Sequence, residues 1–354
     1  MRSHEPYDGT RDYWDFFIAE CVRQKAPLYV RLASGVRDDA KLSALAALAR
    51  PGQPMANLIL GAVHFLLLEG MNHELRAQYR TLNPENAPRP SSDPFPLFRD
   101  VCLAHEAKIA AIVASRVTNT NEVGRSAYLR AGFLVVAREA GEPLHLIELG
   151  LSAGLNLYWD RHLYRYVRDG AAFAAGPETA KLTLETQLIG PHVPPLEPTP
   201  RVGLRVGLER DPVDLSDPDA RLWLKALVWP DHKDRFLRLE RALEITSGYA
   251  LDIESGDALS LLPDALAKAP RGGALVVTHT MTTYQFSKDE REALDNLLIL
   301  ASVRRPVWRL SMEWSDGVYP LKLTRYVDGA QQTRLLALCD PQGGMMEWRD
   351  DKSP

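Results

Sequence analysis

The hydrophobic pattern of this chain changes character near residue 140, and this change limits the possible folds more than any other feature. Before that point apolar residues recur three and four positions apart, as in Trp14, Phe17 and Cys21, which is the spacing of one helix face. After it, short apolar runs alternate with helical segments, which is typical of βαβ units and a mainly parallel sheet. We therefore predict an all-helical domain over residues 1–140 and an α/β domain over residues 141–354.

Five short apolar runs are the candidate strands of the α/β domain. Helical segments lie between them, and Asp217 and Ser287 stand where helix N-caps are expected. Near the C-terminus two further runs flank Asp328-Gly329, a turn signal that predicts an antiparallel hairpin. This order predicts a Rossmann-like, methyltransferase-type, mostly parallel sheet with a C-terminal antiparallel hairpin. The strands are expected at 144–149, 202–208, 250–254, 274–278 and 307–313, the clearest helices at 217–227, 231–245 and 288–302, and the hairpin at 322–327 and 333–338.

The predicted α/β domain contains about forty residues more than the simplest form of this fold requires. They cover roughly 160–200 and include a strand-like run at 181–189 and a proline-dense stretch at 191–200. We interpret them as an insertion, for which a β-hairpin flap over the cofactor edge is one possible arrangement. The sequence does not fix its position.

Composition and charge restrict the partners. Hydrophobic residues make up 45% of the chain and charged residues 25%, as in soluble globular proteins. A net charge of −4 offers no basic field for nucleic acid. The three cysteines match no metal-ligand spacing and are too few for a disulfide framework. We expect a cytoplasmic protein with a small-molecule substrate and no metal. We also expect no membrane partner, because the longest apolar run (58–68) is a buried helix, shorter than the roughly 20 residues that a membrane span needs.

The sharpest local pattern lies at residues 145–156, which read HLIELGLSAGLN. Here a strand ends in an acid and leads through small residues into a predicted helix. Glycine permits positive φ or close backbone approach, and N–H groups at a helix start can face a carboxylate or phosphate. We expect Glu148 to bind the ammonium of an amino-acid group in a cofactor. The loop would hold the same amino-acid end of the cofactor through Gly150, Ser152, Ala153, Gly154 and Asn156.

Acids also follow the next two predicted strands. Glu209 stands at the carboxyl end of the second strand, where an acid can bind a ribose diol, with Asp211 as the alternative. Asp257 follows the third strand, where an aspartate in methyltransferases commonly meets the adenine amino group. Either residue could instead be an ordinary polar residue of a loop. Because parallel strands end at one edge of a sheet, the three acids are expected to lie close together. The pattern E-x-G-x-S-x-G at residues 148–154 resembles the first motif of the methyltransferases, with Ser152 where many of them have glycine. This resemblance implies S-adenosylmethionine as the cofactor.

Three more residues are candidates for contact with a methyl acceptor, and we place them in the catalytic set. His279 ends the fourth predicted strand. Asn121 and Arg125 lie at a helix start, where side chains and free N–H groups can converge on a ligand, and Arg125 would bind an anionic group. The structural alternatives are a hydrogen-bonded neutral histidine, and a helix cap at Asn121 with Arg125 paired to Glu122 or to a carboxylate at the domain interface.

The loop also matches G-x-S-x-G, the nucleophile elbow of α/β-hydrolases. In that interpretation Ser152 is the nucleophile, Asp257 the orienting acid and His279 the base. An elbow normally follows several strands and a glycine-rich oxyanion loop. Here everything before residue 144 is predicted to be helical, and no such glycine loop is present. The pattern therefore favours cofactor binding, with a serine hydrolase and a non-catalytic cofactor-binding protein as alternatives.

At these residues the chain resembles the domain-of-unknown-function 2332 family of bacterial proteins. The resemblance spans most of the chain and implies a helical N-terminal part joined to a methyltransferase-like domain, without a reaction or substrate. The motifs that carry it are residues 118–125 (TNTNEVGR), the loop 148–156 with Trp159-Asp160-Arg161 after it, residues 209–212, and Trp229-Pro230.

Taken together, these patterns predict an S-adenosylmethionine-dependent methyltransferase that acts on a small polar or anionic acceptor. Methyl transfer depends on holding two reactants in line more than on acid-base strength. A set of residues without an obvious general base is therefore compatible with this activity.

Overall fold

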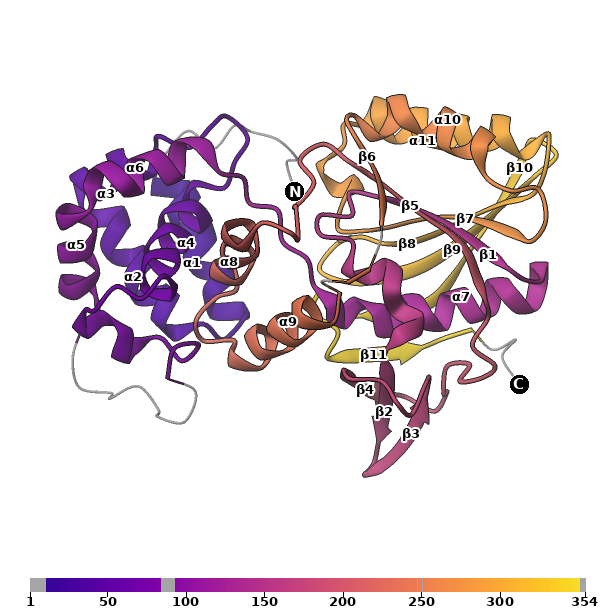
Figure 1. Cartoon of the computed structure of the whole chain (residues 1–354), viewed down its shortest axis with the longest axis horizontal. Helices are drawn as coiled ribbons and strands as arrows, with labels where there is room; N and C mark the ends of the chain where they lie inside the picture. Colours follow the sequence, from indigo (N-terminus) through magenta and orange to yellow (C-terminus); the bar gives the residue numbers. More distant parts are fainter. Residues whose placement is uncertain (1–10, 84–92, 247, 250, 351–354) are drawn as a thin grey trace. The chain divides into compact units, whose positions relative to one another are not determined.

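Residues that pack together divide the chain into two units, and each unit draws on two stretches of sequence (Figure 1). The computed structural model describes residues 11–83, 93–246, 248–249 and 251–350. The first unit comprises Met1–Thr120 and Val213–Leu243, and the second comprises Asn121–Pro212 and Glu244–Pro354. The division at residue 120 differs from our boundary at residue 140, because the last helix before the first strand packs with the sheet.

The first unit is helical, and one helix lies at its centre. Nearly every side chain of α4 (Met55–Leu68) is buried, His64 included, because α4 packs against α2, α3, α5, α6 and α8. A helix that is apolar on all sides is expected in such a position, which confirms the predicted buried helix. No helix in the described part of the chain is both long and apolar enough to span a membrane. The surrounding helices are α1 (Arg11–Arg23), α2 (Pro27–Asp38), α3 (Ala40–Ala46), α5 (Phe95–Ala104), α6 (Glu106–Ser115), the short η1 (Glu74–Gln78), α8 (Pro218–Ala226) and most of α9 (Lys233–Thr246).

The second unit is built on one sheet, whose strand order among the described residues is β3-β2-β4-β11-β10-β9-β8-β7-β1-β5-β6. The last five strands of this order run parallel to one another. When these five parallel strands are numbered along the chain, their order across the sheet is 5-4-1-2-3. Read from the other edge it is 3-2-1-4-5, the order of the doubly wound Rossmann sheet. The predicted α/β class, with a mostly parallel sheet after a helical region, is confirmed. Their bounds are β1 (Leu144–Leu149), β5 (Val202–Glu209), β6 (Asp252–Ser255), β7 (Ala274–Thr280) and β8 (Val307–Met312).

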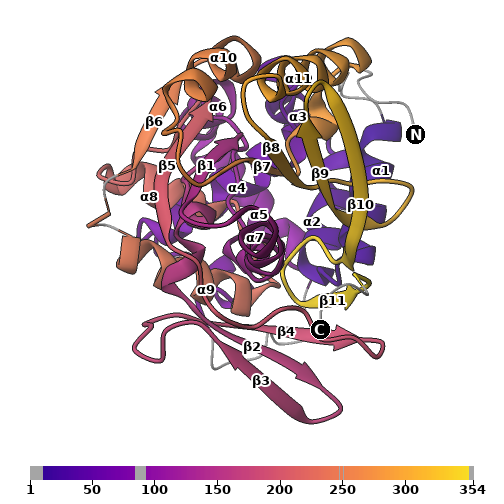
Figure 2. The same ribbon diagram turned by 90° about the vertical axis from the view of Figure 1, so that its right-hand side faces the viewer.

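Helices cover both faces of the parallel strands (Figure 2). α10 (Ala258–Lys268) and α11 (Lys288–Ser302) pack on the face that carries Ile147 and Val277. α11 has the predicted bounds and begins with the predicted cap, because Ser287 and Glu290 form a reciprocal capping box. The other face is covered by α7 (Ser126–Ala140). There a Cβ at Gly132 would lie 2.5 Å from the Leu310 side chain, so glycine allows the helix to approach the sheet closely.

The C-terminal strands form an antiparallel meander next to β8. β9 (Tyr319–Val327) and β10 (Ala330–Cys339) are joined by Asp328-Gly329, both with positive φ. This is the turn geometry that matches the twist of a hairpin, so the predicted hairpin is confirmed. β11 (Met345–Trp348) then pairs with β10.

The insertion extends the sheet beyond β11. β2 (Leu163–Arg168) and β3 (Ala171–Ala175) form a hairpin, and β4 (Thr183–Ile189) joins it to β11. The strand-like run at 181–189 is confirmed as β4. The hairpin lies at the opposite end of the strand order from β5 and β6, so it continues the sheet rather than forming a separate flap.

A buried arginine of α7 holds the segment that follows β4. Arg130 has no exposed surface, and its guanidinium donates to the Leu196 carbonyl and to Thr199 Oγ1 at 3.2 Å. It also lies over the Tyr164 ring, 5.5 Å from its centroid. Buried guanidinium groups require such partners, because an unsatisfied charge in the interior is costly.

Replacing this arginine should release the insertion. Arg130→Met leaves the carbonyl and hydroxyl acceptors without a donor and should lower the free energy of unfolding by roughly 2 to 4 kcal/mol. Amide hydrogen exchange should then accelerate at Leu196, Glu197 and Thr199, the residues of segment 194–199 that carry a backbone N–H. Arg138→Met is the matched control, because Arg138 reaches the same segment from the same helix but is exposed. Equal exchange in both variants would contradict the anchoring role of Arg130.

Candidate functional site

The carboxyl ends of four neighbouring strands meet at one edge of the sheet and bring the predicted acids there. Glu148 is in register with Gly207 of β5 and with Thr278 of β7. Glu209 ends β5 beside Ser255 of β6. Asp257 follows β6 directly and caps α10. The structure thus places the three acids at successive strand ends, as the chain order of the motifs predicts.

The loop after β1 turns through alternating backbone conformations. Gly150, Ser152 and Gly154 have φ of +66°, +57° and +70°, a region that favours glycine and strains serine. A Cβ at Gly150 would lie 2.5 Å from Thr282, and one at Gly154 would lie 2.1 Å from the Leu251 side chain. The glycines are therefore required by the chain's own packing. The loop leads into a short 3-10 segment, η3 (Leu155–Arg161), kinked at Tyr158, and not into the α-helix that we predicted.

Glu209 ties this loop to the end of β5. Its Oε2 accepts from the Ser152 N–H at 2.8 Å, and its Oε1 accepts from the Asp211 N–H at 3.2 Å. Successive residues of opposite φ turn backbone N–H groups toward one side, which makes a concave site for anions. In this structure that site binds a carboxylate of the chain itself.

Glu148 is a buried acid whose Oε2 has no hydrogen-bond partner. The residue is 2% exposed, and Oε2 makes no hydrogen bond within the described part of the chain. The Oγ1 of its register neighbour Thr278 is likewise buried and unbonded. Burial, and then the charge of Glu209, raise the pKa of Glu148 to about 8, against an opposing effect of Arg125. The carboxyl group is therefore mostly protonated near neutral pH.

The segment before α7 is fastened to the loop by two side chains. Asn121 Oδ1 accepts from the Leu155 N–H, and Ser126 Oγ donates to Asn156 Oδ1, each at 2.9 Å. The cap of the short helix η2 (Val123–Arg125) is Glu122, whose carboxylate accepts from the Gly124 N–H. Asn121 is therefore not the cap residue.

Arg125 lies on the α7 side of the sheet, above β7. Its Nε donates to the Pro341 carbonyl at 2.9 Å, and its Nη1 lies 3.5 Å from Thr280 Oγ1. Glu148 is on the same face, because its neighbours in β1, Ile147 and Leu149, face α10 and α11. The structure thus brings Arg125, Thr280 and Glu148 to one side of the sheet.

His279 lies on the other face and is fully buried. Arg309 Nε donates to its Nε2 at 2.9 Å, and a guanidinium nitrogen only donates. The proton of the ring is therefore on Nδ1, which donates to Glu313 Oε1 at 2.6 Å. Burial and then Arg309 lower the pKa of His279, which favours the neutral ring. Both nitrogens are engaged, so the ring presents no free nitrogen to a methyl acceptor or to Ser152.

Glu313 is a residue of this edge that we did not single out. It follows β8, and its carboxylate accepts from the N–H groups of Thr282, Thr283 and Tyr284 at 3.0 to 3.2 Å. Burial alone raises its pKa, but the bonds from His279 and these N–H groups give a net lowering. The carboxylate fixes the loop after β7, where Thr282 packs on Gly150. Glu313 ends the strand predicted at 307–313, and this position could have identified it as a candidate residue of the edge.

Asp257 is engaged in local structure. Its Oδ1 accepts from the Ser260 N–H and hydroxyl at 3.0 Å, and its Oδ2 lies 3.3 Å from Arg210. The helix-cap bond to Ser260 is the largest cause of its lowered pKa. A contact with adenine remains a prediction.

A family model described as "Uncharacterized protein conserved in bacteria" matches residues 13–348. Searches of the curated proteins and of the solved structures gave no significant match. Within the described residues, no three His, Cys, Asp or Glu side chains are grouped to hold a metal ion. These comparisons therefore name no reaction for the carboxyl edge of the sheet.

The buried state of Glu148 should make stability depend on pH. Burial raises the pKa of Glu148 from its ordinary value of 4.5 to about 8, so between these values the folded state holds a proton that the unfolded chain releases. Stability should therefore fall as pH rises through this window, by roughly 1.4 kcal/mol per pH unit. Glu148→Gln removes the titrating group and should flatten the slope.

Urea unfolding between about pH 5 and pH 8 measures this effect. The matched control is Glu185→Gln, which removes an acid that is exposed on β4 and should leave the slope unchanged. Parallel slopes for the parent and Glu148→Gln would show that Glu148 does not titrate in this range.

Proposed function

Because the chain belongs to the domain-of-unknown-function 2332 family, whose description names no reaction, we propose its function from the site itself. We infer that it binds S-adenosylmethionine at the carboxyl edge of the parallel sheet. The proposed reaction transfers the methyl group to a small polar or anionic acceptor.

The unbonded carboxyl group of Glu148 carries this proposal. A buried polar atom without a partner is unfavourable by roughly 1 to 3 kcal/mol, and a ligand that supplies a donor removes that penalty. An ammonium group at this position would also favour the ionised carboxylate, since an opposite charge nearby lowers a carboxyl pKa. The methionine end of the cofactor offers such a group. The fit rests on Glu148, because Gly150 and Gly154 are already explained by packing.

Glu209 is placed to bind the ribose while it holds the loop. A carboxylate has about four lone-pair positions, and two of them accept from the N–H groups of Ser152 and Asp211. The others suit a vicinal diol at the end of the second strand of the fold. Asp257, half exposed at the next strand end, would meet the adenine amino group in competition with Arg210. In this proposal Ser152, Ala153 and Asn156 line the loop around the methionine end.

In this proposal Asn121 and Arg125, in the segment before α7, face the acceptor. A guanidinium with a planar set of donors suits a carboxylate or phosphate of the acceptor. His279 takes a positioning role, because it holds Glu313, and Glu313 holds the loop with Thr282. The role of these residues in methyl transfer would be to keep the cofactor and the acceptor in line.

The geometry disfavours the serine hydrolase. A base for Ser152 needs a free ring nitrogen, and those of His279 are bonded to Arg309 and Glu313. A non-catalytic cofactor-binding protein differs from the enzyme only in turnover, and experiment separates the two.

Binding of the cofactor should release a proton. At pH 7 a carboxyl group of pKa about 8 is mostly protonated, and it should ionise when the ammonium binds, with release of about one proton. Calorimetric titration with S-adenosylmethionine, in two buffers of different ionisation enthalpy, measures this number. Glu148→Gln should abolish the release and weaken binding at least about tenfold.

One control variant and two outcomes test the proposal. Glu185→Gln should bind as the parent does. Absence of binding heat in the parent would end the cofactor proposal. Binding without transfer of labelled methyl to any of a panel of small carboxylates and phosphates would favour the non-catalytic protein.

A further inference from the structure

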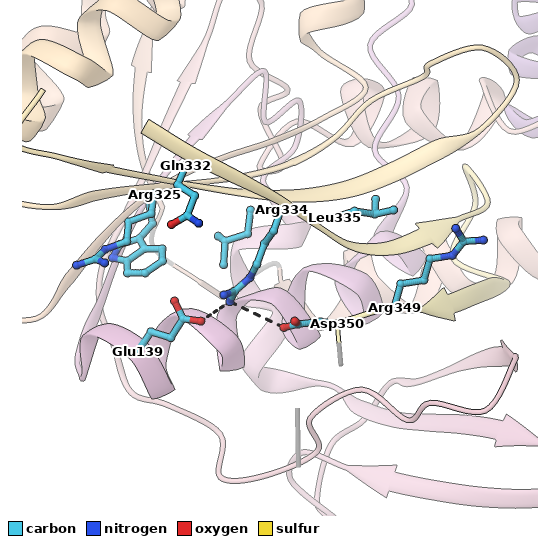
Figure 3. Close-up of a pocket in the computed structure, with 9 residues that line it drawn as sticks. Glu139, Arg325, Gln332, Arg334, Leu335, Arg349 and Asp350 are labelled. Atoms are coloured by element: carbon cyan, nitrogen blue, oxygen red, sulfur yellow. Dashed lines mark hydrogen bonds and ion pairs between the residues drawn. The ribbon is translucent and has the colours of Figure 1, made fainter. Parts of the chain in front are cut away.

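A cavity lies on the α7 side of the sheet, near the start of β8 (Figure 3). Its volume is about 430 Å³. Trp308, Arg325 and Gln332 form one row across β8, β9 and β10, because the strand registers pair them in turn. Arg334 stands beside Leu323 in the next row. The floor of the cavity is thus set by the pairing of three antiparallel strands, which holds these side chains side by side.

The two acids of the cavity are already used by one arginine. Arg334 pairs with Glu139 from the last turn of α7, and its Nη2 lies 3.8 Å from Asp350 Oδ2. Figure 3 shows the two carboxylates on either side of the Arg334 guanidinium. Arg349, which also lines the cavity, is 2.9 Å from Glu347. These arginines are therefore compensated.

Arg325 differs from Arg334 and Arg349 because it has no counterion within the described chain. Its guanidinium lies over the Trp308 indole, with Cζ 5.4 Å from the ring centroid, and the residue is exposed. Stacking on an aromatic face holds the guanidinium plane and leaves its edge N–H groups available. Such a fork matches the oxygens of a carboxylate or phosphate.

Two buried donors also lack acceptors. Trp308 is 3% exposed, and its Nε1 makes no hydrogen bond in the described structure. Arg334 Nε is buried and unbonded as well. Buried N–H groups are nearly always satisfied, so a ligand that brings acceptors to this cavity would remove the penalty of these two donors.

We propose that this cavity binds the oxyanion group of a small molecule, a carboxylate or a phosphate, with Arg325 as its counterion and Trp308 Nε1 as a neutral donor. The cavity is separate from the cofactor edge, since Trp308 and Glu313 stand near opposite ends of β8. Five residues of strand correspond to roughly 17 Å. The inference is therefore independent of the proposed methyl transfer.

The indole N–H of Trp308 can report on binding. In a ¹H–¹⁵N spectrum of the full chain its resonance is identified by its loss in Trp308→Phe. Titration with inorganic phosphate, and separately with succinate, should shift this resonance saturably, whereas chloride at equal ionic strength should not. The phosphate and carboxylate arms show which oxyanion is preferred, and saturation by either supports the site.

Arg325→Gln should weaken the binding at least about tenfold, because it removes charge-assisted hydrogen bonds. Arg325→Lys keeps the charge without the planar fork and should fall between. The matched control is Arg304→Gln, which makes the same charge change at an exposed arginine of the same unit and should bind as the parent does. Lack of a saturable shift with both anions, or equal affinity in Arg325→Gln and the parent, would overturn the proposal.

Discussion

Hydrogen bonds from loop N–H groups to strand-end carboxylates hold the carboxyl edge of the sheet together. A chain that leaves a strand carries N–H groups that no ladder satisfies, and these need acceptors when they are buried. Glu209 supplies them to the loop after β1, Glu313 to the loop after β7, and Asp257 to the start of α10. Each acid thereby fixes a neighbouring segment of the edge.

Glu148 is the exception in this set, and the exception is informative. It stands at the end of the central strand of the parallel part, yet its Oε2 accepts from no backbone donor. An acid that served only to hold the fold would be bonded, as its neighbours are. Its burial near Glu209 keeps it protonated, so the free site carries less negative charge than its acids suggest. A cationic ligand would change that state, which would couple its binding to proton release.

Much of the fold follows from local pattern, because strands and helices with a strong period have few alternatives. β1 and α11 have the predicted bounds, and Ser287, Asp217 and the Asp328-Gly329 turn act as predicted. The strand ends with Glu148 and Glu209 were predicted for the same reason. The apolar composition of α7 indicates that the helix is buried, as it is from Ser126 to Val136, but not against which element. The unit to which α7 belongs was therefore not predictable.

Contacts between distant residues could not be derived from the sequence. The pairs His279–Glu313 and Arg309–His279 join residues about thirty positions apart, and their geometry depends on the register of β7 with β8. That register decides that both nitrogens of His279 are bonded, which no local motif reveals. The row of Trp308, Arg325 and Gln332 depends in the same way on two antiparallel pairings.

α7 runs between the two proposed sites. Its first residue, Ser126, is bonded to Asn156 of the segment after the loop. Glu139, near its end, is bonded to Arg334 in the lining of the cavity beside β8. Between them, Gly132 lies against Leu310 and Arg130 holds the insertion. A helix of 15 residues spans roughly 22 Å, and the close contact at Gly132 leaves it no room to move toward the sheet. Packing at Gly132 therefore excludes a shift of α7 toward the sheet at either proposed site.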